Sequence, residues 1–173
     1  MSVVAFKDGF MAGDTQVTDG HAAILGYQPK VMRIDSKKFG KSLLGLCGDM
    51  HHMEWLKHWI MQNEFDMTTV KSLENNIYQL PNRTAEDAGA LLVTSEEAHR
   101  SRNSPDYEPM CLTFSYFKGG PVRIRRKFLA IGSGSHLALG AMASGKTASE
   151  AVKIASELAP GLCGGSCVEL KLG

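Results

Sequence analysis

Short apolar segments separated by glycine and proline make up the first fifty residues of the chain. Val3 to Phe6 is apolar and β-branched, and Lys7-Asp8-Gly9 then offers a turn, because glycine tolerates the positive φ of a tight hairpin. A later pair of segments turns near Gln28-Pro29, and Gly48 closes the last apolar segment. The pattern predicts a β-meander with strands at 3–6, 10–18, 22–27, 31–34 and 42–47, the third and fourth forming a hairpin.

The hydrophobic period changes from two to about 3.6 residues after Asp49. Asp49 is suited to cap a helix in which Met53, Leu56, Trp59 and Ile60 share one face. Strands and helices then come in separate runs, which favours antiparallel sheets covered by helices over alternating βαβ units. The predicted elements are a helix at 68–80, strands at 89–94, 110–117, 122–126 and 128–131, helices at 135–143 and 148–158, and a strand at 168–172, with a polar loop at 96–108.

The overall composition is that of an ordinary globular chain. With 173 residues, 43% of them hydrophobic and 21% charged, the chain is expected to form one domain, 1–173, around a single core. Its formal net charge of +1 gives no reason to expect a nucleic-acid or anionic-membrane partner. The apolar runs fall short of the roughly 20 residues of a membrane helix, and the N-terminus lacks a signal-peptide pattern. We therefore expect a cytoplasmic protein.

Cysteine and histidine residues give little sign of a metal site. The four cysteines are scattered and are expected to be reduced thiols. Cys163 and Cys167 would supply only half of a zinc site, and His51 and His58, which share a helical face, lack a neighbouring ligand pattern. The basic segment Arg123 to Lys127 alternates as a strand and is interpreted as a solvated face. No metal or cofactor is expected.

The stretch GAMASGKT, Gly140 to Thr147, matches the G-x-x-x-x-G-K-[ST] pattern of a phosphate-binding loop. Such a loop lies directly between a strand and a helix, so that its N–H groups face the phosphates. Here the nearest strand is predicted to end at Ile131, and Gly140 falls inside a predicted helix. Thr147 begins T-A-S-E, a capping box for the next helix. We therefore interpret the stretch as a helix end, a turn and an N-cap, and expect no nucleotide binding.

Ser2 is the residue whose position suggests chemistry. Methionine before so small a residue is ordinarily removed, which would leave Ser2 with its hydroxyl and a free α-amine. An α-amine has a pKa of about 8, close enough to neutral for it to act as general base for its own hydroxyl. Such a nucleophile needs a nearby cation, an anion that holds the cation, and N–H donors for the oxyanion. Asp14, Lys30 and the segment from Gly45 to Gly48 are candidates for these roles.

Several motifs, taken in order, resemble one family. The segments SVVAFKDGFMAGDTQVTDG, PKVMRI, LLGLCGD and AIGSGSHLALGAM look like the proteasome β-type branch of the N-terminal nucleophile (Ntn) hydrolases. The chain most resembles HslV-like peptidases and the short HslV-like proteins of bacteria and their phages, over nearly its whole length. The resemblance implies an α+β fold, a four-layer αββα sandwich of antiparallel sheets, which agrees with the predicted element order.

The resemblance assigns roles to five residues. Ser2 falls where the family has its N-terminal threonine nucleophile, Asp14 on the aspartate of the GD motif, and Lys30 on the lysine before the V-x-R-[IL] strand. Gly48 is the leading candidate for the oxyanion N–H. Ser133, in GSG, matches a serine that sits beside the amino end and assists proton transfer.

Two departures from the family pattern bear on activity. The nucleophile would be serine, which lacks the methyl group that fixes the threonine rotamer. The family usually has an aspartate and a serine in the loop after the last long helix, whereas this chain has Ala159 or Pro160 and Cys163 there. An incomplete support shell would lower activity, and retention of Met1 would abolish it.

The resemblance implies a peptidase that cleaves peptide bonds of polypeptide substrates within a homo-oligomeric ring, with access that depends on a separate ATPase. Two alternatives stay open. One is a catalytically weak or inactive homologue that keeps the fold as a ring-forming structural or regulatory subunit. The other is an amidase of the same superfamily that acts on a small amide.

Overall fold

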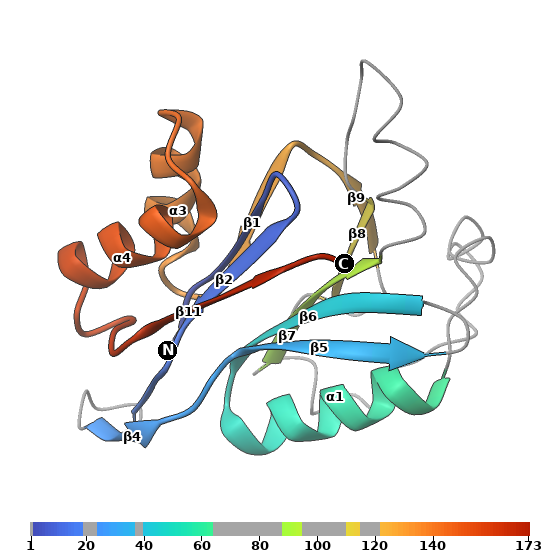
Figure 1. Cartoon of the computed structure of the whole chain (residues 1–173). Coiled ribbons are helices and arrows are strands. Elements are labelled where there is room, and N and C mark those ends of the chain that lie inside the picture. The colour runs from blue at the N-terminus through green and yellow to red at the C-terminus, as the bar shows by residue number, and fades with distance from the viewer. Residues whose placement is uncertain (1, 19–23, 37–39, 64–87, 95–109, 115–121) are drawn as a thin grey trace.

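The computed structural model describes residues 2–18, 24–36, 40–63, 88–94, 110–114 and 122–173. Two antiparallel sheets pack face to face, and helices cover their outer sides (Figure 1). Helix α1 (Met50–Asn63) packs on one sheet, while α3 (Ser135–Ala143) and α4 (Ala148–Leu158) pack on the other. The predicted α+β fold, a four-layer αββα sandwich, is therefore confirmed.

The first sheet has four strands in the order β10-β1-β2-β11, and every pairing is antiparallel. The register Lys7↔Phe10 leaves only Asp8 and Gly9 in the turn between β1 and β2. These two residues have φ of 52° and 84°, the positive values of a tight two-residue hairpin. The strands are β1 (Val4–Lys7), β2 (Phe10–Asp14), β10 (Phe128–Ile131) and β11 (Cys167–Lys171).

The second sheet has five strands in sequential order, β5 to β9, again all antiparallel. The longest is β6 (Gly40–Gly48), which is buried without interruption from Ser42 to Cys47, as its apolar run predicts. It pairs with β5 through Val31↔Gly45 and with β7 through Gly48↔Ala88. The other strands are β5 (Val31–Ser36), β7 (Ala88–Thr94), β8 (Met110–Phe114) and β9 (Val122–Arg125).

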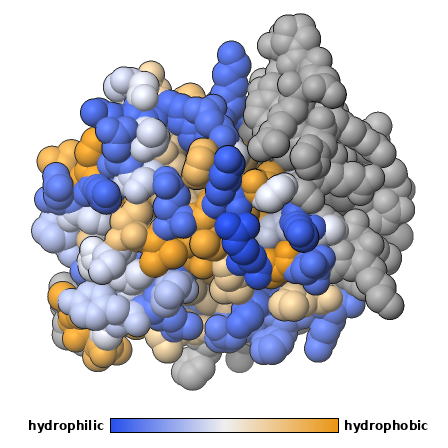
Figure 2. All heavy atoms as spheres, in the orientation of Figure 1, coloured by the Kyte–Doolittle hydropathy of each residue, from blue (hydrophilic) through white to orange (hydrophobic). Residues whose placement is uncertain are grey.

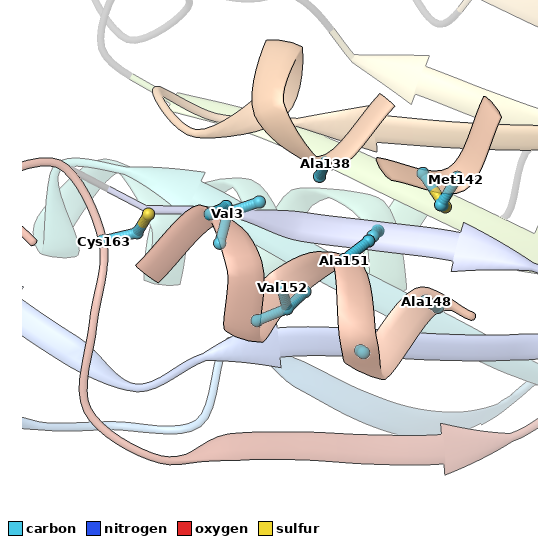
Figure 3. Packing of buried hydrophobic residues seen from close by; sticks show 10 residues of the cluster. Val3, Ala138, Met142, Ala148, Ala151, Val152 and Cys163 are labelled. Atoms are coloured by element: carbon cyan, nitrogen blue, oxygen red, sulfur yellow. The ribbon is translucent and has the colours of Figure 1, made fainter. Parts of the chain in front are cut away.

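Strand β1 is buried on both faces because it lies between two apolar layers. Val4 and Phe6 face the second sheet and pack with residues such as Leu43 and Leu91. Val3 and Ala5 point the other way, following the two-residue period of a strand, and pack against α3 and α4 (Figure 3). The start of the chain is thus held in the centre of the sandwich, as its apolar sequence requires.

The stretch from Gly140 to Thr147 does not form a phosphate-binding loop. Strand β10 ends at Ile131, and Gly140 lies within α3. The Thr147 side chain accepts a hydrogen bond of 3.2 Å from the Glu150 N–H, and the Glu150 carboxylate accepts one of 2.8 Å from the Thr147 N–H. This is the predicted capping box, and both helices have the predicted bounds.

One predicted pairing is wrong. Strand β4 (Ile24–Tyr27) does not form a hairpin with β5; it pairs with β3 (Gln16–Thr18) in a separate two-stranded sheet. The Gln28 N–H donates 2.7 Å to the Thr15 carbonyl and holds the chain beside β3, while β5 pairs along its full length with β6. Apolar alternation identifies strands but not their partners. The predicted helix at 68–80 and polar loop at 96–108 lie outside the described residues.

Strand β4 also carries an exposed apolar patch. Ile24, Leu25 and Tyr27, hereafter the β4 patch, are exposed by 54%, 68% and 66%. Hydrophobic side chains are visible at the lower left of Figure 2, where Figure 1 draws β4. Of the helices that the structure describes, none has the length and apolar character needed to cross a membrane.

The close contact of the two sheets at Gly45 yields a stability prediction. A Cβ atom at this position would lie 2.5 Å from Val4 Cγ1 and 3.0 Å from Met11 Sδ. Gly45→Ala should therefore lower the free energy of unfolding by about 1–3 kcal/mol through overpacking. Urea denaturation followed by circular dichroism measures this change.

Gly140→Ala is the matched control, because a Cβ atom there meets no neighbouring atom within 4 Å. In the interior of α3 the substitution should raise the free energy of unfolding by about 0.5–1 kcal/mol. Equal effects of the two substitutions would contradict the packing of the two sheets at Gly45.

Candidate active site

Ser2 is buried next to the end of β6, with 1% of its surface exposed. Its carbonyl accepts a 3.1 Å hydrogen bond from the Gly134 N–H. The next residue is held from the other side, since the Val3 N–H donates 2.8 Å to Asp14 Oδ1 and the Asp14 N–H donates 3.1 Å to the Val3 carbonyl. The backbone around Ser2 is therefore fixed by two separate parts of the chain.

Asp14 and Lys30 form a buried ion pair beside this segment. Lys30 Nζ lies 2.8 Å from both carboxylate oxygens of Asp14, and the two residues are 3% and 1% exposed. The Lys30 ammonium also donates 2.7 Å to the Gln16 carbonyl. Asp14 Oδ1 is shared between Lys30 and the Val3 N–H, so that the carboxylate links the cation directly to the start of the chain.

Burial lowers the pKa of Lys30 below its ordinary value, and the charge and hydrogen bond of Asp14 oppose that effect. The acceptors around Nζ, two carboxylate oxygens and one carbonyl, all require the protonated form. We therefore assign Lys30 as an ammonium ion. Its charge lies close to Ser2 while its protons are directed to Asp14 and Gln16.

Gly48 places a backbone donor against the Ser2 hydroxyl. Its N–H points at Ser2 Oγ over 3.4 Å, a long and therefore weak hydrogen bond. Its φ of 116° lies in the left-handed region, which side chains disfavour, so a glycine is needed at the end of β6 for this orientation. A weakly engaged N–H beside a hydroxyl can bind an oxyanion that develops on a group bound at that hydroxyl.

The structure thus brings together four of the five predicted site residues: Ser2, Asp14, Lys30 and Gly48. Ser133 is different, because its side chain is exposed and makes no hydrogen bond within the described part of the chain. The neighbouring Gly134 makes the contact with Ser2 through its backbone N–H. The sequence analysis predicted a role for the serine of GSG and missed Gly134, the glycine that follows it. The GSG motif was the one sequence feature that could have indicated this glycine.

The loop after α4 contributes backbone groups where the family pattern has an acid and a serine. The Gly164 N–H donates 3.1 Å to Asp14 Oδ2, and the Gln16 side-chain amide donates 3.1 Å to the Pro160 carbonyl. Cys163 is fully buried, and its sulfur points toward Val3 (Figure 3). Burial, together with the Asp14 charge, raises the pKa of the Cys163 thiol, so the neutral thiol is favoured. Sequence reasoning missed Gln16 and Gly164.

The described residues contain no group of three or more His, Cys, Asp or Glu side chains placed to hold a metal ion. The arrangement instead offers a hydroxyl, a buried cation, its counter-ion and a backbone donor. An acyl transfer through a serine oxygen uses such parts together with a general base for the hydroxyl proton.

Solved structures share this fold, and two of them illustrate the similarity. The chain is similar to eukaryotic HslV from Trypanosoma brucei over 98% of each chain, with 18% identity and a TM-score of 0.59. It is also similar to Thiobacillus denitrificans BPH, solved in complex with epoxomicin, over 99% of this chain and 98% of that chain, with 17% identity and a TM-score of 0.57. No family model and no curated protein sequence matches the chain. The resemblance to the HslV fold is thereby confirmed.

The buried ion pair yields a second stability prediction. Lys30→Met removes the cation and leaves the Asp14 carboxylate buried without its counter-ion, which should cost about 3–5 kcal/mol of unfolding free energy. In the double variant Asp14→Asn/Lys30→Met no charge is left behind, and the amide oxygen can still accept the Val3 N–H. We expect the double variant to be more stable than Lys30→Met, as measured by urea denaturation.

Thr94→Val is the control for this pair, because the buried Thr94 hydroxyl makes no hydrogen bond with the described residues. It should change the unfolding free energy by less than about 1 kcal/mol. The loss of unfolding free energy in the double variant is compared with the sum of the losses in Asp14→Asn and Lys30→Met. Equal values would show that Asp14 and Lys30 are not energetically coupled.

Proposed function

We propose that the protein is an HslV-like peptidase that uses Ser2 as an N-terminal nucleophile after removal of Met1. Ser2 Oγ attacks the carbonyl carbon of the scissile peptide bond, while the Ser2 α-amine takes the hydroxyl proton. The tetrahedral intermediate collapses, the amine returns the proton to the leaving nitrogen, and an ester to Ser2 is formed. A water molecule, deprotonated by the same amine, then hydrolyses the ester.

The observation that carries this proposal is the meeting of the Gly48 N–H and the Asp14–Lys30 pair at Ser2. The Gly48 N–H, 3.4 Å from Ser2 Oγ, would stabilise the oxyanion that develops on the carbonyl oxygen. The Lys30 charge would disfavour protonation of the adjacent α-amine and so keep it available as a base. Asp14 holds Lys30 in place and orients the Val3 N–H next to the nucleophile.

The fold comparisons support the same reading at a coarser level. One structural neighbour is named as an HslV, and the other was solved with epoxomicin bound. In both, the aligned region extends over nearly the whole of each chain, which supports a shared fold along the full length of the polypeptide.

Intact-mass measurement with a peptide epoxyketone such as epoxomicin tests the mechanism. This probe offers one electrophilic carbon to a hydroxyl and another to a free α-amine on the same residue. We expect the purified protein to lack Met1 and to gain one probe mass, and we expect Ser2→Ala to abolish the adduct. Ser2→Thr should keep it, because the threonine side chain also carries a hydroxyl on Cβ.

Cys163→Ala is the control, since this thiol is fully buried with a raised pKa and should not react. Labelling that survives Ser2→Ala would sink the proposed mechanism. Retention of Met1 together with absence of an adduct would favour the alternative, a structural or regulatory subunit with the same fold. Labelling without cleavage of peptides would favour an amidase acting on small amides.

We further propose that the chain assembles into a homo-oligomeric ring that encloses the Ser2 sites. The β4 patch supports this, because Leu25 is 68% exposed and neighbours two more exposed apolar side chains on one edge strand. Such a chamber would admit polypeptide substrates through a separate ATPase in the cytoplasm.

Size-exclusion chromatography with light scattering tests the assembly. We expect a mass several times the 18.8 kDa of one chain at micromolar concentration. Leu25→Glu should shift the population toward smaller species, because it introduces a charge into the β4 patch. A clean monomer of the unmodified protein would contradict the ring.

A further inference from the structure

Gln16 is a buried polar residue whose backbone carbonyl, backbone N–H and side-chain NH₂ group all form hydrogen bonds around the Asp14–Lys30 pair. It is 5% exposed and stands at the beginning of β3. Its carbonyl accepts 2.7 Å from Lys30 Nζ, its N–H donates 3.0 Å to the Gly164 carbonyl, and its side-chain amide donates 3.1 Å to the Pro160 carbonyl. One residue thus touches the cation and the loop after α4.

The same loop reaches back to the counter-ion. The Gly164 N–H donates 3.1 Å to Asp14 Oδ2, and the Gly164 carbonyl accepts from the N–H groups of both Thr15 and Gln16. Gly164 lies so close to the Gln16 side-chain amide that a Cβ atom would collide with Gln16 Oε1. The loop and the start of β3 are therefore in direct contact, and the side chain of Gln16 fills the space between them.

The loop itself brings no charge to this contact. Residues 159–166 read APGLCGGS, with neither an acidic nor a basic side chain. The loop forms its hydrogen bonds with Asp14 and Gln16 through backbone groups. The direction of a backbone N–H or carbonyl depends on the conformation of the loop, so these hydrogen bonds require the loop to be held in one conformation. Two side chains tie this loop to the segment that leads away from Asp14. The Thr15 hydroxyl accepts 3.0 Å from the Ser166 N–H at the end of the loop, and the Gln16 amide donates to the Pro160 carbonyl at its beginning.

We propose that Gln16 is a positioning residue: its side-chain amide holds the loop at Pro160 so that the Gly164 N–H stays on Asp14, which in turn holds Lys30 beside Ser2. The hydrogen bonds from Gln16 to Pro160 and from Gly164 to Asp14 are called the Gln16 clasp. The role in catalysis rests on the proposed peptidase function. The clasp is electrically neutral, so it orients the ion pair without adding a charge next to Lys30.

Two substitutions distinguish the hydrogen bond donated by the Gln16 side chain from the packing of that side chain. Gln16→Leu has nearly the same size but no donor, and Gln16→Glu keeps the shape but turns an acceptor toward the Pro160 carbonyl. Both should make the Gly164 amide proton exchange about tenfold faster in native-state hydrogen exchange, because the loop opens more often once its tie is lost. Thr94→Val, at the opposite end of the second sheet from Gly48, is the matched buried control and should leave the exchange unchanged.

The rate of Ser2 labelling by the epoxyketone gives the functional readout. In Gln16→Leu the maximal labelling rate should fall about tenfold, while the probe concentration for half-maximal rate stays the same, because the clasp orients the site and does not touch the probe. A variant with lower thermal stability but unchanged Gly164 exchange and unchanged labelling rate would overturn the proposal. So would a loss confined to Gln16→Glu, which would mark an effect of charge.

Gly164 hydrogen exchange tests the clasp, and Ser2 labelling tests the proposed peptidase function, so the two proposals can fail independently. If the unmodified protein is not labelled at Ser2, the peptidase mechanism fails, and Gly164 exchange still decides whether the clasp holds the ion pair. An unchanged hydrogen-exchange rate of the Gly164 amide in both Gln16 variants would contradict the proposed role of the clasp, even if the protein is a fully active peptidase.

Discussion

The arrangement at the start of the chain depends on one buried carboxylate. Asp14 binds the Lys30 ammonium through both oxygens, accepts the Val3 N–H and accepts the Gly164 N–H, so it joins three other segments of the chain to its own strand. An ionised group this deeply buried is tolerable only when its lone pairs are occupied. The requirement to satisfy Asp14 therefore places β1, β5 and the loop after α4 around a common point.

The two sheets make that burial possible. Strand β1 is apolar on both faces, and its central position between α3, α4 and the second sheet removes its first residues from water. The close approach of the sheets at Gly45 and the left-handed turn at Gly48 then bring the end of β6 to Ser2. Catalytic geometry of this kind is a consequence of packing, because no local segment of the chain contains all the parts.

The stretch 140–147 and the Asp14–Lys30 pair show that a short sequence match predicts function less well than the secondary structure around it. The stretch from Gly140 to Thr147 has every letter of a phosphate-binding loop, yet it is the end of α3, a turn and the N-cap of α4. Asp14 and Lys30 belong to no such dense motif, and they form a direct ion pair. The hydrophobic periodicity distinguished the two cases, because it predicted which strands and helices flank the stretch 140–147 and which flank Asp14 and Lys30.

The amino-acid sequence by itself determined that antiparallel sheets are covered by helices, and it determined the bounds of α3 and α4, because periodicity, capping and glycine placement are local properties. The order of the four layers and the roles of the candidate site residues came from the family resemblance. The sequence did not determine that β4 pairs with β3, or that Gly134 and Gly164 donate hydrogen bonds to Ser2 and Asp14. The hydrogen bonds of Gly134 and Gly164 join residues more than a hundred positions apart through backbone N–H groups, which every residue but proline possesses and which therefore leave no mark in the sequence. Only the tertiary structure decides which of them are aimed at Ser2 and Asp14.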